Sequence, residues 1–476
     1  MTKDETDSSA QSDVEPDAES DAEPGSESGP SRAPRSGGDF TGPSDDFAAS
    51  GAHVSDAPPP EDFVRSPTPP AARRRAFTIL FFCLISTGMG NSMTFAILPP
   101  LAREISMPDI WVSLVYTISS SFFLVMSQVW GSVSDAIGRK PVVVLGLLGF
   151  SFSMAFVSAA VQLGLAGVLS VVWVFVTLGA GRAAFGALGS ATAPAASAYV
   201  ADRTSPSERT EALATMSAGF GLGAAIGPAF AAWLTPSLGL AAPLMISGAL
   251  AIFAAVAVWR LLPERTRPQT AAERAERKPP WRYAFDRRLG AMVIFGSATW
   301  IGQAVGLQTI NFYVMDRIGQ EGAAAAGYAG AVLTSGALAS LVVQLAVIPR
   351  MRLGPRMAMI IGGASMGLGA LMLATSTEFG PILFGFTLSG LGMGFARPGM
   401  TAGMSLAVEP HEQGAAAGLA AGLAGVGFVA APALGMGLYS AVGPVAPYWL
   451  LTAILALATV HAVLSPAIRR AGRRAG

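Results

Sequence analysis

The chain of 476 residues is poor in charge, cysteine and histidine, and each shortage excludes a class of protein. Charged residues make up 13% of it, whereas a soluble globular protein carries roughly 25%. One cysteine, Cys83, cannot build a disulfide framework, and three histidines leave no Cys/His zinc site. No nucleotide-binding Gly-x-x-x-x-Gly-Lys-Ser/Thr loop occurs, and no nucleophile and base cluster together. We therefore expect no metal, no cofactor, no nucleic-acid partner and no enzymatic activity.

The acidic residues that are present gather at the N-terminus. Residues 1–70 hold 16 acidic and four basic side chains, a net charge of −12, and the rest of the chain carries +12. This segment is rich in Ser, Pro and Gly, so it cannot bury enough apolar surface to offset the entropy of ordering. It also lacks the basic and apolar regions of a secretory signal. We predict that residues 1–72 form a disordered acidic tail, which is a solvated spacer or, alternatively, binds a partner.

Behind the tail, long apolar runs recur twelve times. A membrane-spanning helix needs about 20 mostly apolar residues. The runs lie near 76–101, 111–131, 141–163, 167–200, 212–236, 239–262, 289–315, 324–348, 357–376, 380–406, 413–440 and 446–466. The long hydrophilic segment 263–288 separates a half at 73–262 from a half at 289–468, and a basic tail follows at 469–476. We predict an all-α integral membrane protein with twelve transmembrane helices in two pseudo-symmetric six-helix halves.

An internal repeat supports the division into halves. A shift of 204 residues matches rare Pro and Glu positions as well as glycines: Pro194 with Pro398, Pro206 with Pro410, Glu208 with Glu412, Pro228 with Pro432, and Gly223 with Gly427. Two related halves around a site near the bilayer midplane are a design of secondary transporters.

The basic residues predict the orientation. With an even number of spans, 23 of the 27 Lys and Arg residues after residue 70 fall on the side that holds both termini. Arg103 and Arg317 fall on the opposite side, and Arg182 and Arg397 lie inside spans. Because cytoplasmic loops carry the excess of Lys and Arg, we expect both termini and the central loop in the cytoplasm. We place the protein in a bacterial inner membrane, as a monomer.

A short motif follows the second run, where a tight turn is expected. Its residues are Gly131, Asp135, Gly138, Arg139 and Lys140, in the pattern Gly-x-x-x-Asp-x-x-Gly-Arg-Lys. This pattern resembles the signature loop of the major facilitator superfamily, which lies between the second and third of twelve spans. The second half keeps only part of it, since Gly354 and Arg356 are present but Met351 stands at the Asp position.

Further motifs extend the resemblance over residues 74–470. Arg182 and Gly186 are similar to the family's Arg-x-x-x-Gly helix motif. The fifth run carries Gly223, Gly227 and Pro228, which resemble the Gly-x-x-x-Gly-Pro motif of the drug:proton antiporter branch. The segment from Ala396 to Gly414 resembles the tetracycline-resistance-type multidrug efflux transporters. The resemblance implies proton-coupled efflux of small amphipathic compounds by alternating access.

The resemblance also implies roles for the charged residues. Asp135 and Arg139 would form a cytoplasmic gate, with Asp202 as the partner of Arg139; alternatively, these charges only set the topology. Arg182 would serve proton coupling or contact substrate, because an intramembrane guanidinium is costly unless it is paired or wetted. A structural hydrogen bond to neighbouring helices is the alternative for Arg182.

Polar and aromatic residues of four runs are candidates for a substrate cavity. They lie in the first, fourth, seventh and tenth runs and are Asn91, Thr94, Phe95, Arg182, Trp300, Gln303, Gln308, Asn311 and Arg397. No Asp or Glu lies in the middle of a run, so a coupling proton must use end-of-helix groups such as Asp135, Asp316 or Glu104, or Arg182 with water. The alternative function is a metabolite or organic-anion carrier, which Arg397 and the missing acids favour.

Overall fold

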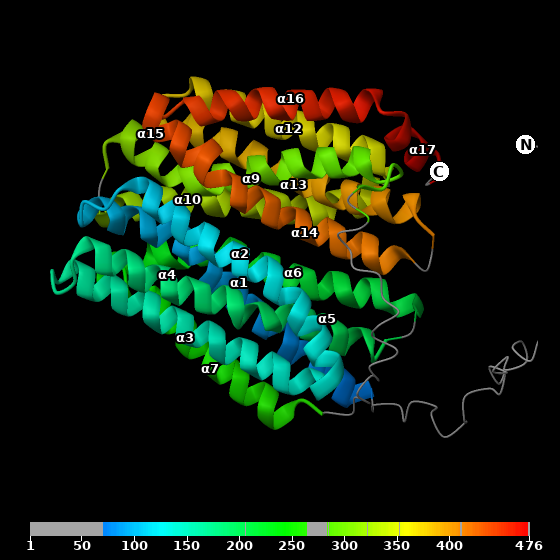
Figure 1. The fold of residues 1–476 in the computed structure, drawn as a ribbon, viewed down its shortest axis with the longest axis horizontal. Coiled ribbons are helices and arrows are strands. Elements are labelled where there is room, and N and C mark those ends of the chain that lie inside the picture. The colour runs from blue at the N-terminus through cyan, green and yellow to red at the C-terminus, as the bar shows by residue number, and fades with distance from the viewer. Residues whose placement is uncertain are drawn as a thin grey trace, which may run out of the picture. The chain divides into compact units, whose positions relative to one another are not determined.

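The computed structural model describes residues 70–204, 206–263, 283, 285–320, 322–351, 353–409 and 412–474. The predicted acidic tail lies outside these residues up to position 69, and most of the predicted central loop, 264–282 and 284, also lies outside. Within the described residues, twelve helices are long and apolar enough to cross a membrane, which confirms the predicted number. Figure 1 shows the helices side by side as one bundle.

Six spans come from the N-terminal part of the chain. Their elements are α1 (Pro70–Glu104), α2 (Asp109–Ile137), α3 (Arg139–Leu165), α4 (Val171–Ala187), the 3₁₀ turn η2 (Gly189–Ala191), α5 (Thr192–Ala201), α6 (Pro206–Leu238) and α7 (Ala242–Leu261). The fourth span, Val171–Ala201, contains α4, η2 and α5. Its interruption has a local cause, because Pro194 cannot donate to a carbonyl four residues back and its ring crowds that carbonyl.

Six more spans come from the C-terminal part. Their elements are α9 (Gly290–Ile318), α10 (Gly322–Val342), the π segment η4 (Val343–Val347), α11 (Ile348–Met351), α12 (Pro355–Thr375), α13 (Phe379–Ala407), α14 (Gln413–Ala431), the π segment η6 (Pro432–Gly437), α15 (Leu438–Val442) and α16 (Ala446–Leu464). Residues 469–474 of the predicted basic tail lie in a further short helix, α17 (Pro466–Arg474), and the last two residues of that tail lie outside the described residues.

Successive spans run in opposite directions, so the turns gather at two ends of the bundle. We call the end with the turns at Gly138, Arg203 and Gly354 the basic end. We call the other end, with the turns 105–108, 166–170 and 376–378, the far end. In Figure 1, α17 lies at the basic end and α15 at the far end.

Equivalent glycines bring together equivalent helices in the two halves. A Cβ on Gly223 of α6 would collide with the carbonyl oxygen of Ile85 in α1. A Cβ on Gly427 of α14 would collide with the carbonyl oxygen of Trp300 in α9. The 204-residue shift pairs these two glycines, and each lets the fifth span of its half pack closely on the first, as small residues do in lipid.

The surface toward the surroundings is strongly apolar. Large side chains on several spans are more than half exposed, among them Phe82 (61%), Trp173 (61%), Phe253 (72%) and Leu457 (70%). Exposure of this kind over many helices is unfavourable in water and suits contact with lipid.

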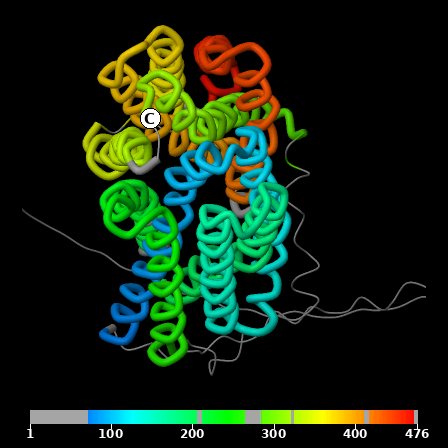
Figure 2. The backbone as a smooth tube through the Cα atoms, turned by 90° about the vertical axis from the view of Figure 1, so that its left-hand side faces the viewer, coloured from blue at the N-terminus to red at the C-terminus, as the bar shows by residue number. Residues whose placement is uncertain are grey.

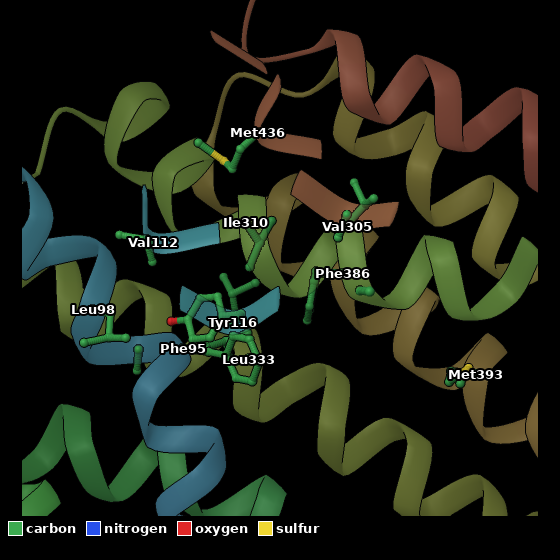
Figure 3. Close-up of a cluster of buried hydrophobic side chains, with 14 of the residues drawn as sticks. Phe95, Leu98, Val112, Tyr116, Val305, Ile310, Leu333, Phe386, Met393 and Met436 are labelled. Carbon is green, nitrogen blue, oxygen red and sulfur yellow. The ribbon is translucent and has the colours of Figure 1, made fainter. Parts of the chain in front are cut away.

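Among the described residues, the apolar cluster that the two halves share runs from mid-depth to the far end. The larger apolar cluster joins Phe95, Leu98 and Tyr116 of the first half to Val305 and Ile310 of α9 (Figure 3). A smaller cluster fills the basic end of the first half by itself, with Leu80, Val142, Tyr199 and Val258. Figure 2 shows the two groups of helices, blue to green and yellow to red, against each other.

Candidate functional site

The turn between α2 and α3 holds an ion cluster at the basic end. Gly138 adopts φ 102°, a left-handed conformation that favours glycine, and this allows α3 to begin directly at Arg139. The Arg139 guanidinium is buried, with Nε 3.1 Å from Asp202 Oδ2 and Nη1 donating to Ser134 Oγ at 2.7 Å. Nη1 also pairs with Asp135.

Asp135 and Arg139 each lie at a helix end where their charge is unfavourable, and each is stabilised by pairing with the other. Asp135 lies near the C-terminus of α2, and Arg139 begins α3, so each charge opposes the dipole of its own helix. Their pairing removes both penalties and, through Asp202, ties the end of α5 to the same turn. Lys140 lies over the Trp259 ring, with Nζ 5.6 Å from the ring centroid.

The predicted helix motif of α6 lies where this helix contacts α1 of its own half on one side and α10 of the second half on the other. Gly227 faces Ser92 and the carbonyl of Met89 in α1, where a Cβ would not fit. On the other side, a Cβ on Gly330 of α10 would come within 2.7 Å of the Pro228 carbonyl oxygen. Gly223, Gly227 and Pro228 thus lie where α6 packs against its own half and against the second half.

Arg182 is buried inside the fourth span without a carboxylate partner among the described residues. It is 3% exposed, and its Nη2 donates to Asn91 Oδ1 at 2.8 Å. The guanidinium lies over the Phe185 ring, 4.6 Å from the centroid. Its Nε and Nη1 have no hydrogen-bond partner within the described part of the chain. Arg182 therefore joins the fourth span to the first and keeps unused donors.

A second ion cluster, which we call the far-end network, crosses between the halves. Arg103 of α1 binds Asp109 with two hydrogen bonds, at 2.9 and 2.7 Å, and its Nη1 lies 3.0 Å from Asp316 Oδ1 of α9. The Tyr439 hydroxyl of α15 donates to Asp316 Oδ2 at 2.5 Å. The guanidinium also lies 5.5 Å from the Phe312 ring centroid. This network holds α1 and α2 to α9 and α15.

Beneath the far-end network, a polar seam continues the contact between halves. Ser113 of α2 donates to the Gln308 side chain, and Asn311 donates its Nδ2 proton to the Phe95 carbonyl oxygen. Thr117 of α2 donates to the Phe428 carbonyl oxygen at 3.1 Å. Gln308 and Asn311 are 1% and 0% exposed.

The predicted cavity residues divide into two groups. Thr94, Phe95, Gln308 and Asn311 are buried at this seam, and none of them faces an open space in this conformation. Asn91, Trp300 and Gln303 are half-buried, and Arg397 is exposed. The Arg397 guanidinium lies over the Trp300 ring, 5.8 Å from the centroid. Lining of a cavity by the first group stays a prediction for a state in which the seam is open.

Sequence reasoning missed most of the far-end network. It named Asp316 only as a group that could carry a proton, and it counted Arg103 only for orientation. Neither Asp109 nor Tyr439 was selected, because an acid or a tyrosine at a helix end is ordinary. The signal that could have found the network is the isolation of Arg103 on a side with almost no other basic residues.

The fold and these two ion clusters define a class of protein. Twelve membrane-spanning helices in two repeated halves, held together across one end, are an architecture of integral membrane transporters.

Comparison with known proteins agrees with this class. The sequence model of the Major Facilitator Superfamily matches residues 80–348 and 308–475. The chain therefore belongs to the Major Facilitator Superfamily, and it is a transporter and not an enzyme.

The relatives are resistance proteins. The class C tetracycline resistance protein of Escherichia coli is 28% identical over 83% of this chain and 96% of its own length. The class G tetracycline resistance protein of Vibrio anguillarum is 30% identical over 74% of this chain and 87% of its own length. These relatives support the resemblance to the drug:proton antiporter branch.

A solved structure shares the fold. The human organic anion transporter MFSD10 (TETRAN) superposes with a TM-score of 0.61 at 19% identity, over 83% of this chain and 100% of that one.

Proposed function

We propose that this chain exports small amphipathic compounds in exchange for protons, by alternating access, with its basic end in the cytoplasm of a bacterium. The observation that carries this proposal is the contact between α2 and α14. The two helices touch on the side of the far end, and they no longer touch at Gly131, near the basic end. The names of the relatives supply the drug-like class of the cargo.

The seam follows a seven-residue spacing on α2. Thr117 bonds Phe428 of α14, and Leu124 contacts Gly425, whose Cβ would come within 2.8 Å of the Leu124 side chain. Positions seven apart lie on nearly the same face of a helix. Gly131 comes next on this face, and a Cβ there would meet no atom within 4 Å.

The free space beside Gly131 indicates which surfaces of α2 and α14 would meet if the basic end closed. On α14, the position seven residues before Gly425 is Gly418. Rocking of the halves would bring Gly131 and Gly418 together while it separates Arg103 from Asp316. The Arg139 cluster lies one turn beyond Gly131, since Asp135 follows it by four positions. The far-end network, which pairs Arg103 with Asp316 across the halves, therefore lies where a two-state rocking motion would be biased.

Besides Arg182 with water, the groups that could carry a coupling proton are carboxylates, and the described spans have theirs at helix ends. Asp316 is the best placed, because its charge holds Arg103 across the halves. Protonation of Asp316 would remove this ion pair and favour opening of the far end. At the basic end, Asp135 pairs with Arg139 within the first half.

The orientation has a direct test. Labelling of a single cysteine placed in the turn at Gly138 should require a permeabilised cell, whereas a cysteine at Ser106 should react from outside. The native Cys83 is buried, so it contributes little background. Labelling of the Gly138 turn from outside the cell would contradict the orientation.

The export function is tested by deleting the gene and by measuring the pH gradient of energised vesicles. Deletion of the gene should raise sensitivity to amphipathic antibiotics, and addition of a substrate to energised vesicles should perturb their pH gradient. An Arg139→Gln variant, expressed at the same level, is the matched control and should fail in both assays. Unchanged drug susceptibility together with unchanged accumulation would remove the drug-export function.

A further inference from the structure

The charged side chains in the middle of the described spans are both arginines. Arg182 and Arg397 each lie at least ten residues from both ends of their spans, and every Asp or Glu of the twelve spans lies near a helix end. Two guanidiniums without a carboxylate are costly inside a membrane protein unless something anionic or water meets them. The interior of the bundle is therefore suited to a negative charge.

Arg397 does not face lipid. It lies about 15 Å from the basic end of α13, at a rise of 1.5 Å per residue. Phe384, which is 59% exposed, marks the outward face of α13, and Arg397 is about 140° away from it around the helix axis. The neighbouring position Gly394 packs on Ser340 of α10, and Met400 packs on Gly296 of α9. The exposed Arg397 side chain thus emerges between α9 and α10.

The faces of α9 and α10 near Arg397 turn toward the first half. At the far end, Asn311 of α9 bonds α1, and Gly330 of α10 packs on α6. An exposed side chain between α9 and α10 therefore points toward the region that the two halves enclose. No ion pair holds Arg397 among the residues that the structure describes.

Trp300 adds an apolar wall and a donor. Its ring lies under the Arg397 guanidinium, which fixes the guanidinium by a cation–π contact and leaves the edge donors available. The Trp300 Nε1 proton is buried and has no partner in the described part of the chain. Deeper in the bundle, Arg182 is 3% exposed and also keeps two nitrogens without a partner.

We infer that the transported compounds are amphipathic organic anions, whose carboxylate or sulfonate binds Arg397 beside Trp300 and whose apolar body lies against the helices. This inference rests on the proposed export function and names its substrate class. Arg397 binds the anion with the fork geometry of a guanidinium. Arg182 offers a second positive charge further along the pathway toward the far end.

The test uses three probes with one ring system and different charge: 2-naphthoate, 2-naphthamide and 2-naphthylmethylammonium. The full-length protein is placed in lipid nanodiscs for calorimetric binding and in proteoliposomes for transport. We expect 2-naphthoate to bind most tightly and to be transported best. Arg397→Gln should weaken naphthoate binding about ten- to hundredfold, as expected for loss of a charged hydrogen bond, and should leave naphthamide binding unchanged.

Two further variants separate binding from folding. Arg397→Lys keeps the charge without the fork, so it should retain part of the preference for naphthoate. Arg469→Gln removes an equal charge from α17 at the basic end and should change none of the three affinities. Unchanged thermal unfolding of Arg397→Gln would exclude a loss of fold.

The outcomes distinguish this inference from the proposed function. Transport of the ammonium or amide probe at least as well as naphthoate overturns the anion assignment and leaves the transporter standing. An anion preference that survives Arg397→Gln overturns the assignment of Arg397. Transport of none of the three probes contradicts the proposed function and the inference together.

Discussion

Two arginines at opposite ends of the bundle differ in what they hold together. Arg139 joins Asp135 and Asp202 within one half, so its cluster stays intact when the halves move. Arg103 joins Asp109 of its own half to Asp316 of the other half, so its network must break when the far end opens. In the proposed rocking motion, the strength of the far-end network would therefore set the balance between the two states.

Removal of the Asp316 charge should favour opening of the far end. In Asp316→Asn, Arg103 keeps Asp109 but loses the ion pair across the halves. A partly exposed ion pair contributes about 0.2–1 kcal/mol, which corresponds to a population shift of up to about fivefold. Alkylation of a cysteine at Ser113, which this conformation buries, should become faster by a similar factor.

The matched control for Asp316→Asn is Glu378→Gln. Glu378 is an exposed far-end acid that precedes α13, and its charge faces solvent. Equal alkylation rates in wild type and Asp316→Asn would show that the far-end network does not hold this state.

Gly131 tests the closing of the basic end. Because a Cβ at Gly131 meets open space, Gly131→Leu should leave the free energy of unfolding within about 0.5 kcal/mol of wild type. The added side chain should nevertheless block the approach of α14, so substrate transport in proteoliposomes should be lost. Ser132→Leu, on an exposed neighbouring position, serves as control and should transport normally.

The functional residues that could be predicted from the sequence were those in a recognisable motif and those whose charge lies within a membrane span. The motif contained Asp135 and Arg139, and the family resemblance implied Asp202 as the partner of Arg139; the structure places the three together. The hydrogen bond from Arg139 to Ser134 of α2 could not be inferred, because a serine one turn from a helix end is common and indicates no particular partner. The burial of Gln308 and Asn311 depends on how the two halves pack against each other, which the residue types alone do not predict.

At the scale of elements, close helix pairs depend on glycine. α1 and α6 approach so closely that Gly88, Gly223 and Gly227 each face backbone atoms of the partner helix. Dispersion and weak backbone contacts hold such pairs, because lipid supplies no hydrophobic driving force between helices.

A larger side chain at Gly227 should destabilise this helix pair. Gly227→Leu would drive a side chain into the Met89 carbonyl, and overpacking of this kind costs typically about 1–3 kcal/mol. Tryptophan fluorescence on heating in detergent should show a lower unfolding temperature. Gly327→Leu in α10 is the control, because a Cβ there meets nothing within 4 Å. Equal melting of both variants and wild type would contradict the packing account.

The elements themselves were largely predictable from the sequence. Length and apolarity of the runs gave twelve spans, because a bilayer imposes both. The break of the fourth span at η2 and the π segments η4 and η6 were not predicted. The break at η2 lies three residues before Pro194 and the segment η6 begins at Pro432, and a count of apolar residues cannot detect such local effects.

At the scale of the whole molecule, one conformation is closed at the far end. The shared apolar core, the seam and the far-end network all join the halves from mid-depth to that end. The basic end of the first half is filled by its own cluster. With the basic end in the cytoplasm, this is the state that would take up cargo from inside the cell.

The most direct test measures both ends of the molecule at once by pulsed electron spin resonance. One spin-label pair, at Ser106 and Ser440, reports the far end, and a second pair, at Ile137 and Met351, reports the basic end; all four positions are exposed. Substrate with a pH gradient should lengthen the first distance and shorten the second in the same samples. If both distances change in the same direction, or if neither changes while transport proceeds, the two halves do not alternate and the account is wrong.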